Sequence, residues 1–165
     1  MVFETSTLSE AEASALEAVL SRLIPSDENG PGAAEAQVLR FVDRALSGEL
    51  SLLRETYALN LIALDAWALA GHGAPFARLD ATVQDAVLAQ LENGSATGFS
   101  PSADAFFELV REHAIHGMFA DPRHGGNAGY AGWDLLRFPG VKVVFTAADQ
   151  ELDVEVEAAR ADHAA

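Results

Sequence analysis

The chain has 165 residues, of which 50% are hydrophobic and 21% are charged. This length suits one domain, which buries roughly two-thirds of the surface that its unfolded chain exposes. The absence of cysteine excludes disulfides, thiolate metal sites and a cysteine nucleophile. A formal charge of −15 disfavours nucleic acids and anionic lipid surfaces as partners.

The first half of the chain carries three helical patterns. Ser9 and Glu12 have the spacing of a capping box, and an apolar stripe with helical periodicity follows them. A loop begins at Pro25 and leads to a second helix that ends near Gly48. A third and longer helix is predicted from about residue 50 to Gly71.

Two further helices are predicted before the pattern changes. Asp80 is a candidate N-cap for the fourth helix, which stops at Asn93-Gly94. Ser100 and Pro101 are expected at the N-cap and first positions of a fifth helix, which runs to about Gly117.

These patterns predict an all-α fold with one domain over residues 1–165. The bundle of about five helices is expected over about 9–117. An irregular segment rich in glycine and aromatic residues follows, with an ordered loop and a short helix over about 118–146 and an acidic tail over 147–165. Only residues 141–146 have the composition of a strand, and because an isolated strand is not stable, this stretch either pairs with a partner or is merely extended.

Acidic side chains are concentrated at both ends of the chain. Residues 1–37 carry seven acids and one base, and residues 147–165 carry six acids and one base. Two interpretations of these acidic arms remain open. Either they are solvated and keep the protein soluble, or they dock to a basic surface of a partner.

The segment from Met118 to Phe145 does not fit a plain bundle. Irregular segments of this length are usually functional or disordered, and disordered linkers are poor in aromatic residues. Five aromatic residues lie here: Phe119, Tyr130, Trp133, Phe138 and Phe145. The segment is therefore expected to be ordered against a surface, which is either its own bundle or another protein.

One group of residues has the chemistry of metal ligands. His113 and His116 can share a helix face, and Asp121 and His124 follow, a set of imidazole and carboxylate groups that Zn or Fe would accept. The glycines of residues 125–129 lack the spacing of nucleotide-binding loops. An independent metal-binding helical enzyme using the three histidines is the alternative function.

Three blocks of sequence carry a family resemblance: Leu23–Ala33, Glu112–Asn127 and Gly132–Gly140. Their most distinctive parts are Phe-x-Asp-Pro-x-x-Gly-Gly-Asn and Gly-Trp-x-Leu-x-x-Phe-Pro-Gly. In these blocks the chain resembles the gluconate 2-dehydrogenase subunit 3 family, over roughly residues 15 to 140.

The resemblance implies a small, non-catalytic subunit of an FAD-dependent dehydrogenase of the glucose–methanol–choline type. Such enzymes oxidise gluconate, glucose, related sugars or polyols, and the small subunit would stabilise or mature the large flavoprotein subunit. FAD is expected in that partner and no cofactor in this chain. A cytochrome subunit often completes the complex, whereas nucleic-acid binding and direct membrane insertion are not expected.

Many members of the family begin with a twin-arginine signal. Residues 1–8 contain neither such a pair nor a basic region. A cytoplasmic location is therefore expected, and a periplasmic one is the alternative if the chain is exported with a signal-bearing partner.

The surface that binds the large subunit is expected within the glycine-rich and aromatic-rich segment. Its glycines let the backbone turn closely against another surface, with positive φ at Gly125, Gly126 or Asn127. Trp133 and Phe138 offer the largest apolar areas. The predicted partner-binding residues are Phe119, Asp121, Pro122, Gly125, Gly126, Asn127, Tyr130, Gly132, Trp133, Phe138, Pro139 and Gly140. No catalytic or metal-binding residue is assigned.

Overall fold

The computed structural model describes residues 7–140 and residue 147, and this part contains helices and no strand. The predicted all-α class is confirmed. The α-helices are α1 (Glu10–Leu23), α2 (Val38–Leu46), α3 (Arg54–His72), α4 (Ala81–Glu92), α5 (Ala103–Phe119) and α6 (Ala131–Leu135). The 3₁₀ helices are η1 (Ser51–Leu53), η2 (Phe76–Arg78), η3 (Pro122–His124) and η4 (Ala128–Tyr130). The strand-like residues 141–146 and residues 148–165 of the predicted tail lie outside the described residues.

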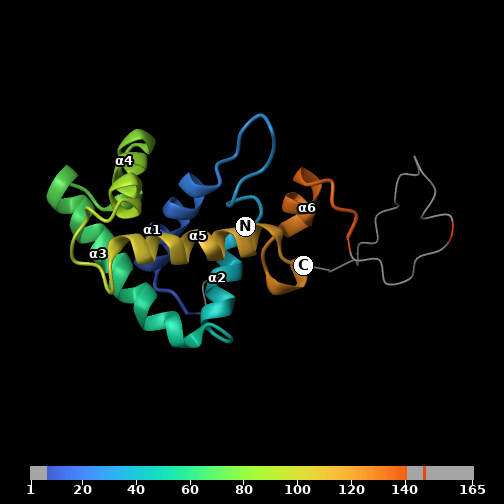
Figure 1. The fold of residues 1–165 in the computed structure, drawn as a ribbon, viewed down its shortest axis with the longest axis horizontal. Coiled ribbons are helices and arrows are strands. Elements are labelled where there is room, and N and C mark those ends of the chain that lie inside the picture. The colour runs from blue at the N-terminus through green and yellow to red at the C-terminus, as the bar shows by residue number, and fades with distance from the viewer. Residues whose placement is uncertain (1–6, 141–146, 148–165) are drawn as a thin grey trace.

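Helix α5 forms the centre of the arrangement, and α1, α2 and α4 pack against it. In Figure 1, α3 and α4 lie at one end of the molecule and α6 lies at the other. The largest fully buried side chains include Tyr57, Phe76 and Phe106, and the Tyr57 and Phe106 rings meet edge to face with centroids 5.9 Å apart. Within residues 7–140, no helix combines the length and apolar character that a bilayer crossing needs.

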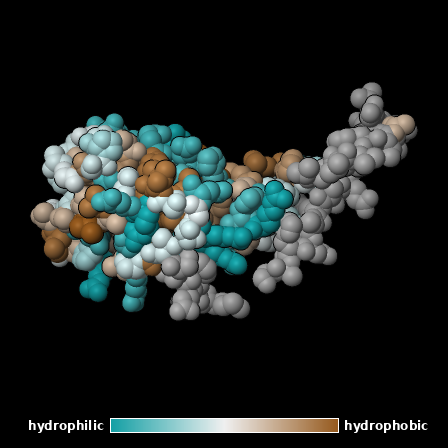
Figure 2. All heavy atoms as spheres, turned by 90° about the horizontal axis from the view of Figure 1, so that it is seen from below, coloured by the Kyte–Doolittle hydropathy of each residue, from teal (hydrophilic) through white to brown (hydrophobic). Residues whose placement is uncertain are grey.

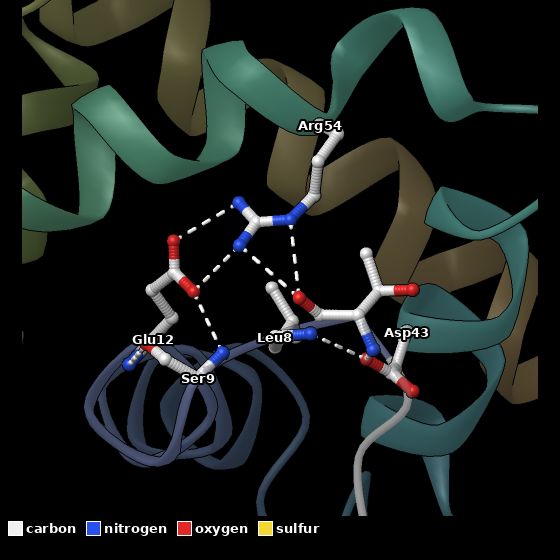
Figure 3. Close-up of polar contacts among 6 residues, drawn as sticks. Leu8, Ser9, Glu12, Asp43 and Arg54 are labelled. Atoms are coloured by element: carbon white, nitrogen blue, oxygen red, sulfur yellow. Dashed lines mark hydrogen bonds and ion pairs between the residues drawn. The ribbon is translucent and has the colours of Figure 1, made fainter.

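Charged groups fix the start of α1. The Ser9 backbone N–H donates to the Glu12 carboxylate at 2.7 Å, which completes the predicted capping box. Arg54 donates to the two Glu12 oxygens at 2.9 and 2.7 Å, and the buried carboxylate of Asp43 accepts the Leu8 N–H at 2.9 Å (Figure 3). We call Glu12, Asp43 and Arg54 the α1 clamp, because together they join the start of α1 to α2 and α3.

Helix α1 belongs to the core and is not an arm. Leu16 and Leu20 are fully buried, and α1 packs against α2, α3, α4 and α5. The interpretation of residues 1–37 as an acidic arm is therefore wrong for residues 10–23. Glu10 and Glu17 lie on the exposed side of an amphipathic core helix.

The predicted stop of the third helix at Gly71 is also wrong. Helix α3 passes through Gly71 and ends at Gly73, which has the left-handed φ of 78°. Glycine is the usual residue at a helix C-terminus with left-handed φ. The helix therefore does end at a glycine, but at Gly73 and not at Gly71.

The predicted start of the fifth helix at Ser100-Pro101 is wrong by two residues. The cap position of α5 is Ser102. Ser100 is instead held by Asn60 of α3, whose side-chain amide donates to the Ser100 carbonyl at 2.8 Å and accepts its N–H at 2.9 Å. This contact between residues 40 positions apart keeps the Ser100 backbone outside the helix.

Candidate partner-binding site

We define the motif segment as residues 119–140, which contain all twelve predicted partner-binding residues. In Figure 1 the segment leaves α5, turns back through η3 and η4, and ends beyond α6 at one end of the molecule. Helix α6 is the short helix that the sequence predicted in this region.

Asn127 joins the segment to the end of α5. Its backbone N–H donates to the Gly117 carbonyl and its side-chain amide to the Ala120 carbonyl, both at 2.8 Å. Its side-chain oxygen accepts the Gly132 N–H at 2.8 Å, and the residue is fully buried with a φ of 47°. Asn127 therefore satisfies carbonyls that a helix end would otherwise leave without partners.

Two glycines bring the backbones into contact. A Cβ atom at Gly126 would overlap the carbonyl oxygen of Gly117, and a Cβ atom at Gly132 would overlap that of Met118. Neither glycine has positive φ. Glycine is therefore required at these positions because a larger residue would not fit, and not because of the backbone conformation. The expectation of positive φ is confirmed for Gly125, at 105°, and for Asn127, but not for Gly126.

The turn between α5 and η3 uses the predicted Asp-Pro chemistry. The Asp121 side chain accepts the backbone N–H of Arg123 at 3.0 Å, and Pro122 occupies the first position of η3. Both residues set the path of the chain and are half-buried.

Trp133 faces the protein's own bundle. The residue is 7% exposed, and its indole N–H donates to the Phe119 carbonyl at 2.8 Å. Its ring lies 5.0 Å from the Phe138 ring, edge to face, and 5.3 Å from the Tyr130 ring. The sequence allowed Trp133 to pack either against its own bundle or against another protein. In the structure it packs against its own bundle.

The side chains that the motif segment presents to solvent are partly different from those predicted. Leu136 is 63% exposed, and Leu135 and Phe138 are each 38% exposed. Figure 2 shows hydrophobic atoms at the surface in separate groups among hydrophilic ones. Leu135 and Leu136 were not among the predicted partner-binding residues, although both lie within the block Gly132–Gly140.

The three blocks of the resemblance come together in space. A Cβ atom at Gly30, in the loop after α1, would overlap the side chain of Leu135. The Ala128 N–H donates to the Ala36 carbonyl at 3.0 Å, and Arg44 of α2 donates to the Arg123 carbonyl at 3.0 Å. The residues just before and within α2 are therefore part of the surface on which the motif segment rests.

The twelve predicted residues separate into three groups by burial. The buried ones are Gly125, Gly126, Asn127, Gly132, Trp133 and Gly140. The half-buried ones are Phe119, Asp121, Pro122, Tyr130 and Pro139. Phe138 is the exposed one.

The sequence analysis missed Gly117 as a contact of the motif segment, although a glycine within a helical pattern is itself a signal of close packing.

The histidines of the proposed metal cluster differ in environment, although the His113 and His116 rings are neighbours on α5 with centroids 6.3 Å apart. His113 is buried, and its Nδ1 lies 2.7 Å from the Tyr57 hydroxyl. Burial lowers the pKa of His113, an effect that Glu112 partly offsets. His116 is exposed, and His124 is in contact with the Arg123 guanidinium at 3.2 Å. Among the residues that the structure describes, no three His, Asp or Glu side chains are grouped to hold a metal ion.

Comparison with known protein families gives a match over most of the chain. The model of the family described as gluconate 2-dehydrogenase subunit 3 matches residues 10–140. The chain belongs to this family. The match includes α1 to α6, all three blocks and the whole motif segment, so the suspected resemblance is confirmed. The family's description is that of an enzyme subunit, which implies partner subunits. No curated protein and no solved structure matches the chain significantly.

Proposed function

We propose that this protein is the non-catalytic small subunit of a flavin-dependent sugar or polyol dehydrogenase, and that it stabilises or matures the large flavoprotein subunit. The observation that carries the proposal is the family match over residues 10–140. The geometry of the motif segment supports the proposal, because its glycines and polar side chains are engaged in packing and hydrogen bonds within the chain.

The polar side chains of the motif segment serve its structure. The Asn127 amide bonds backbone groups on both sides of the turn, the Asp121 carboxylate caps η3, and the Trp133 indole N–H bonds a helix-end carbonyl. Groups engaged in this way are poor candidates for acid–base or nucleophilic chemistry, which needs a side chain facing a substrate. We therefore assign the chemistry to the partner.

The proposal assigns FAD to the large subunit and no cofactor to this chain. A cytochrome subunit is a further proposed partner, which would accept electrons from the flavoprotein. Fractionation of cells that express both subunits decides between the expected cytoplasmic complex and the periplasmic alternative.

Co-expression tests the proposal. The proposal requires a large flavoprotein subunit encoded beside this chain. That subunit is expressed with and without this chain, and its yield and FAD content after purification are measured. We expect the large subunit to co-purify with this chain and to lose yield or FAD when the chain is omitted. A large subunit that reaches full FAD content and activity alone, and never co-purifies with this chain, would contradict the proposal.

A further inference from the structure

A shallow groove runs along the exposed side of α5. It consists of two hollows, of about 390 and about 500 Å3, which share Ile115 and His116. We call it the α5 groove and define it by Phe41, Glu49, Glu112, Ile115, His116 and Phe119. Figure 1 shows α2 beside α5. The first hollow, of about 390 Å3, is lined by side chains of α2, α5 and η3 and by Glu49.

The first hollow has an apolar floor. Phe41 is a core residue that is 7% exposed, Phe119 is half-buried, and Ile115 is 42% exposed at the junction of the two hollows. The groove is open to solvent along its side, unlike the enclosed pockets that hold small ligands. Its shape suits side chains of an extended or helical polypeptide segment.

The sides of the groove are acidic. Glu49 stands at the first hollow, and Glu108 and Glu112 stand at the second. Glu108 is paired with Arg111 at 2.6 Å, whereas Glu49 and Glu112 make no ion pair within 4 Å among the described residues. Of the carboxylate and guanidinium side chains that line the two hollows, three are glutamates and one is an arginine, which leaves an excess of two acids.

This charge selects among possible occupants. A second copy of the chain, with a formal charge of −15, would bring more acids to an acidic groove, which costs free energy at an interface. Anionic lipids and nucleic acids are disfavoured for the same reason. A polypeptide segment with an apolar side chain next to a lysine or arginine is complementary to the groove, because the apolar side chain fits the apolar floor and the cation fits the acidic sides.

We infer that the α5 groove docks a basic, apolar segment of the large subunit. This inference rests on the proposed function and adds the place and the chemistry of the contact. The apolar side chain of that segment lies on Phe41, Ile115 and Phe119, and its cation lies beside Glu49 or Glu112. The groove adjoins the motif segment through Phe119 and His124, so both form one face toward the partner.

Binding of the purified, tagged large subunit to the full chain tests the inference. The groove variants are Ile115→Ser and Glu49→Lys, both at exposed positions, so folding is retained. The matched controls are Ile62→Ser, on the exposed side of α3, and Glu17→Lys, on the exposed side of α1. Each control makes the same chemical change outside the groove, and circular dichroism verifies that all four variants are folded.

We expect each groove variant to bind the large subunit at least about tenfold more weakly than the natural chain, and each control to bind within about twofold. The loss from Glu49→Lys should shrink as salt is raised, because screening weakens the charge contact. Natural-strength binding by both groove variants would overturn the groove inference and leave the proposed function intact. Failure of the natural chain to bind would overturn both. A dimer of the chain alone that Ile115→Ser dissociates would identify a second copy as the occupant and contradict the inference.

Discussion

The α1 clamp and the motif segment both hold a stretch of chain against the same bundle, but they use different chemistry. The clamp uses two carboxylates and a guanidinium, Glu12, Asp43 and Arg54, around the start of α1 (Figure 3). The motif segment uses a neutral amide, Asn127, and glycines that admit backbone contact. The clamp should therefore respond to pH and salt, and the motif segment to changes in side-chain volume.

The largest expected effect comes from Trp133→Ala. The side chain is buried and bonds the Phe119 carbonyl, so its removal leaves a cavity and a carbonyl without its partner. We expect a loss of about 3–5 kcal/mol in the free energy of unfolding of the isolated chain, measured by denaturant unfolding. An unchanged stability combined with loss of binding to the large subunit would instead identify Trp133 as a partner anchor.

Gly132→Ala should cost somewhat less. The added methyl group overlaps the Met118 carbonyl, and the backbone must move to admit it, at about 3 kcal/mol. Gly71→Ala is the matched control, because Gly71 lies inside α3 with no atom within 4 Å of its added Cβ. The control should be neutral or more stable, since alanine favours helix over glycine. Equal effects of the two variants on the thermal midpoint would refute the steric account.

Asn127→Ala should cost about 2–3 kcal/mol in thermal or denaturant unfolding. The substitution removes the bonds to the half-buried Ala120 carbonyl and to the buried Gly132 N–H, and leaves both groups without these partners. It also places alanine at a φ of 47°. Asn127→Gly separates these causes, because glycine tolerates that φ. If Asn127→Gly were fully stable, the side-chain bonds would be shown to contribute nothing.

The smallest expected effect belongs to the clamp. Burial raises the pKa of Glu12, but the hydrogen bonds from Arg54 and Ser9 outweigh burial, so the pKa lies below its usual value. A carboxyl whose pKa is lowered by folding adds stability above its unfolded pKa and loses it as the pH falls through the folded pKa. We expect Glu12→Gln to cost about 1 kcal/mol at neutral pH and progressively less as the pH falls below the usual pKa of a glutamate.

The control for this prediction is Glu17→Gln. Glu17 is exposed on the same helix and makes no ion pair within 4 Å among the described residues, so its replacement should leave the stability unchanged at either pH. A cost of Glu12→Gln that stays the same from neutral to acid pH would show that the charge of Glu12 is not what stabilises the start of α1.

Local sequence signals were sufficient for most of the helices. The capping box at Ser9 and Glu12, the stop at Asn93-Gly94 and the Asp-Pro turn at residue 121 all depend on residues within four positions of one another. Such signals can be identified without knowing the fold, and the structure confirms each of them.

The errors and omissions involve contacts that local patterns do not contain. Asn60 holds Ser100 from 40 positions away, and this moves the start of α5. Gly126 and Gly132 pack closely against the α5 backbone, a contact that no local pattern in the sequence indicates. Composition indicated that Trp133 would be buried and could not indicate which surface it would meet, because its own bundle and a partner offer the same apolar environment.

The most direct test of the central claim is the mass of a mixture of this chain with the purified large flavoprotein subunit, measured by size-exclusion chromatography with light scattering. The account predicts one species with the summed mass of the two chains and the absorbance of bound flavin. Two separate species at concentrations well above micromolar, each with the mass of one chain alone, would contradict the claim that this chain is its accessory subunit.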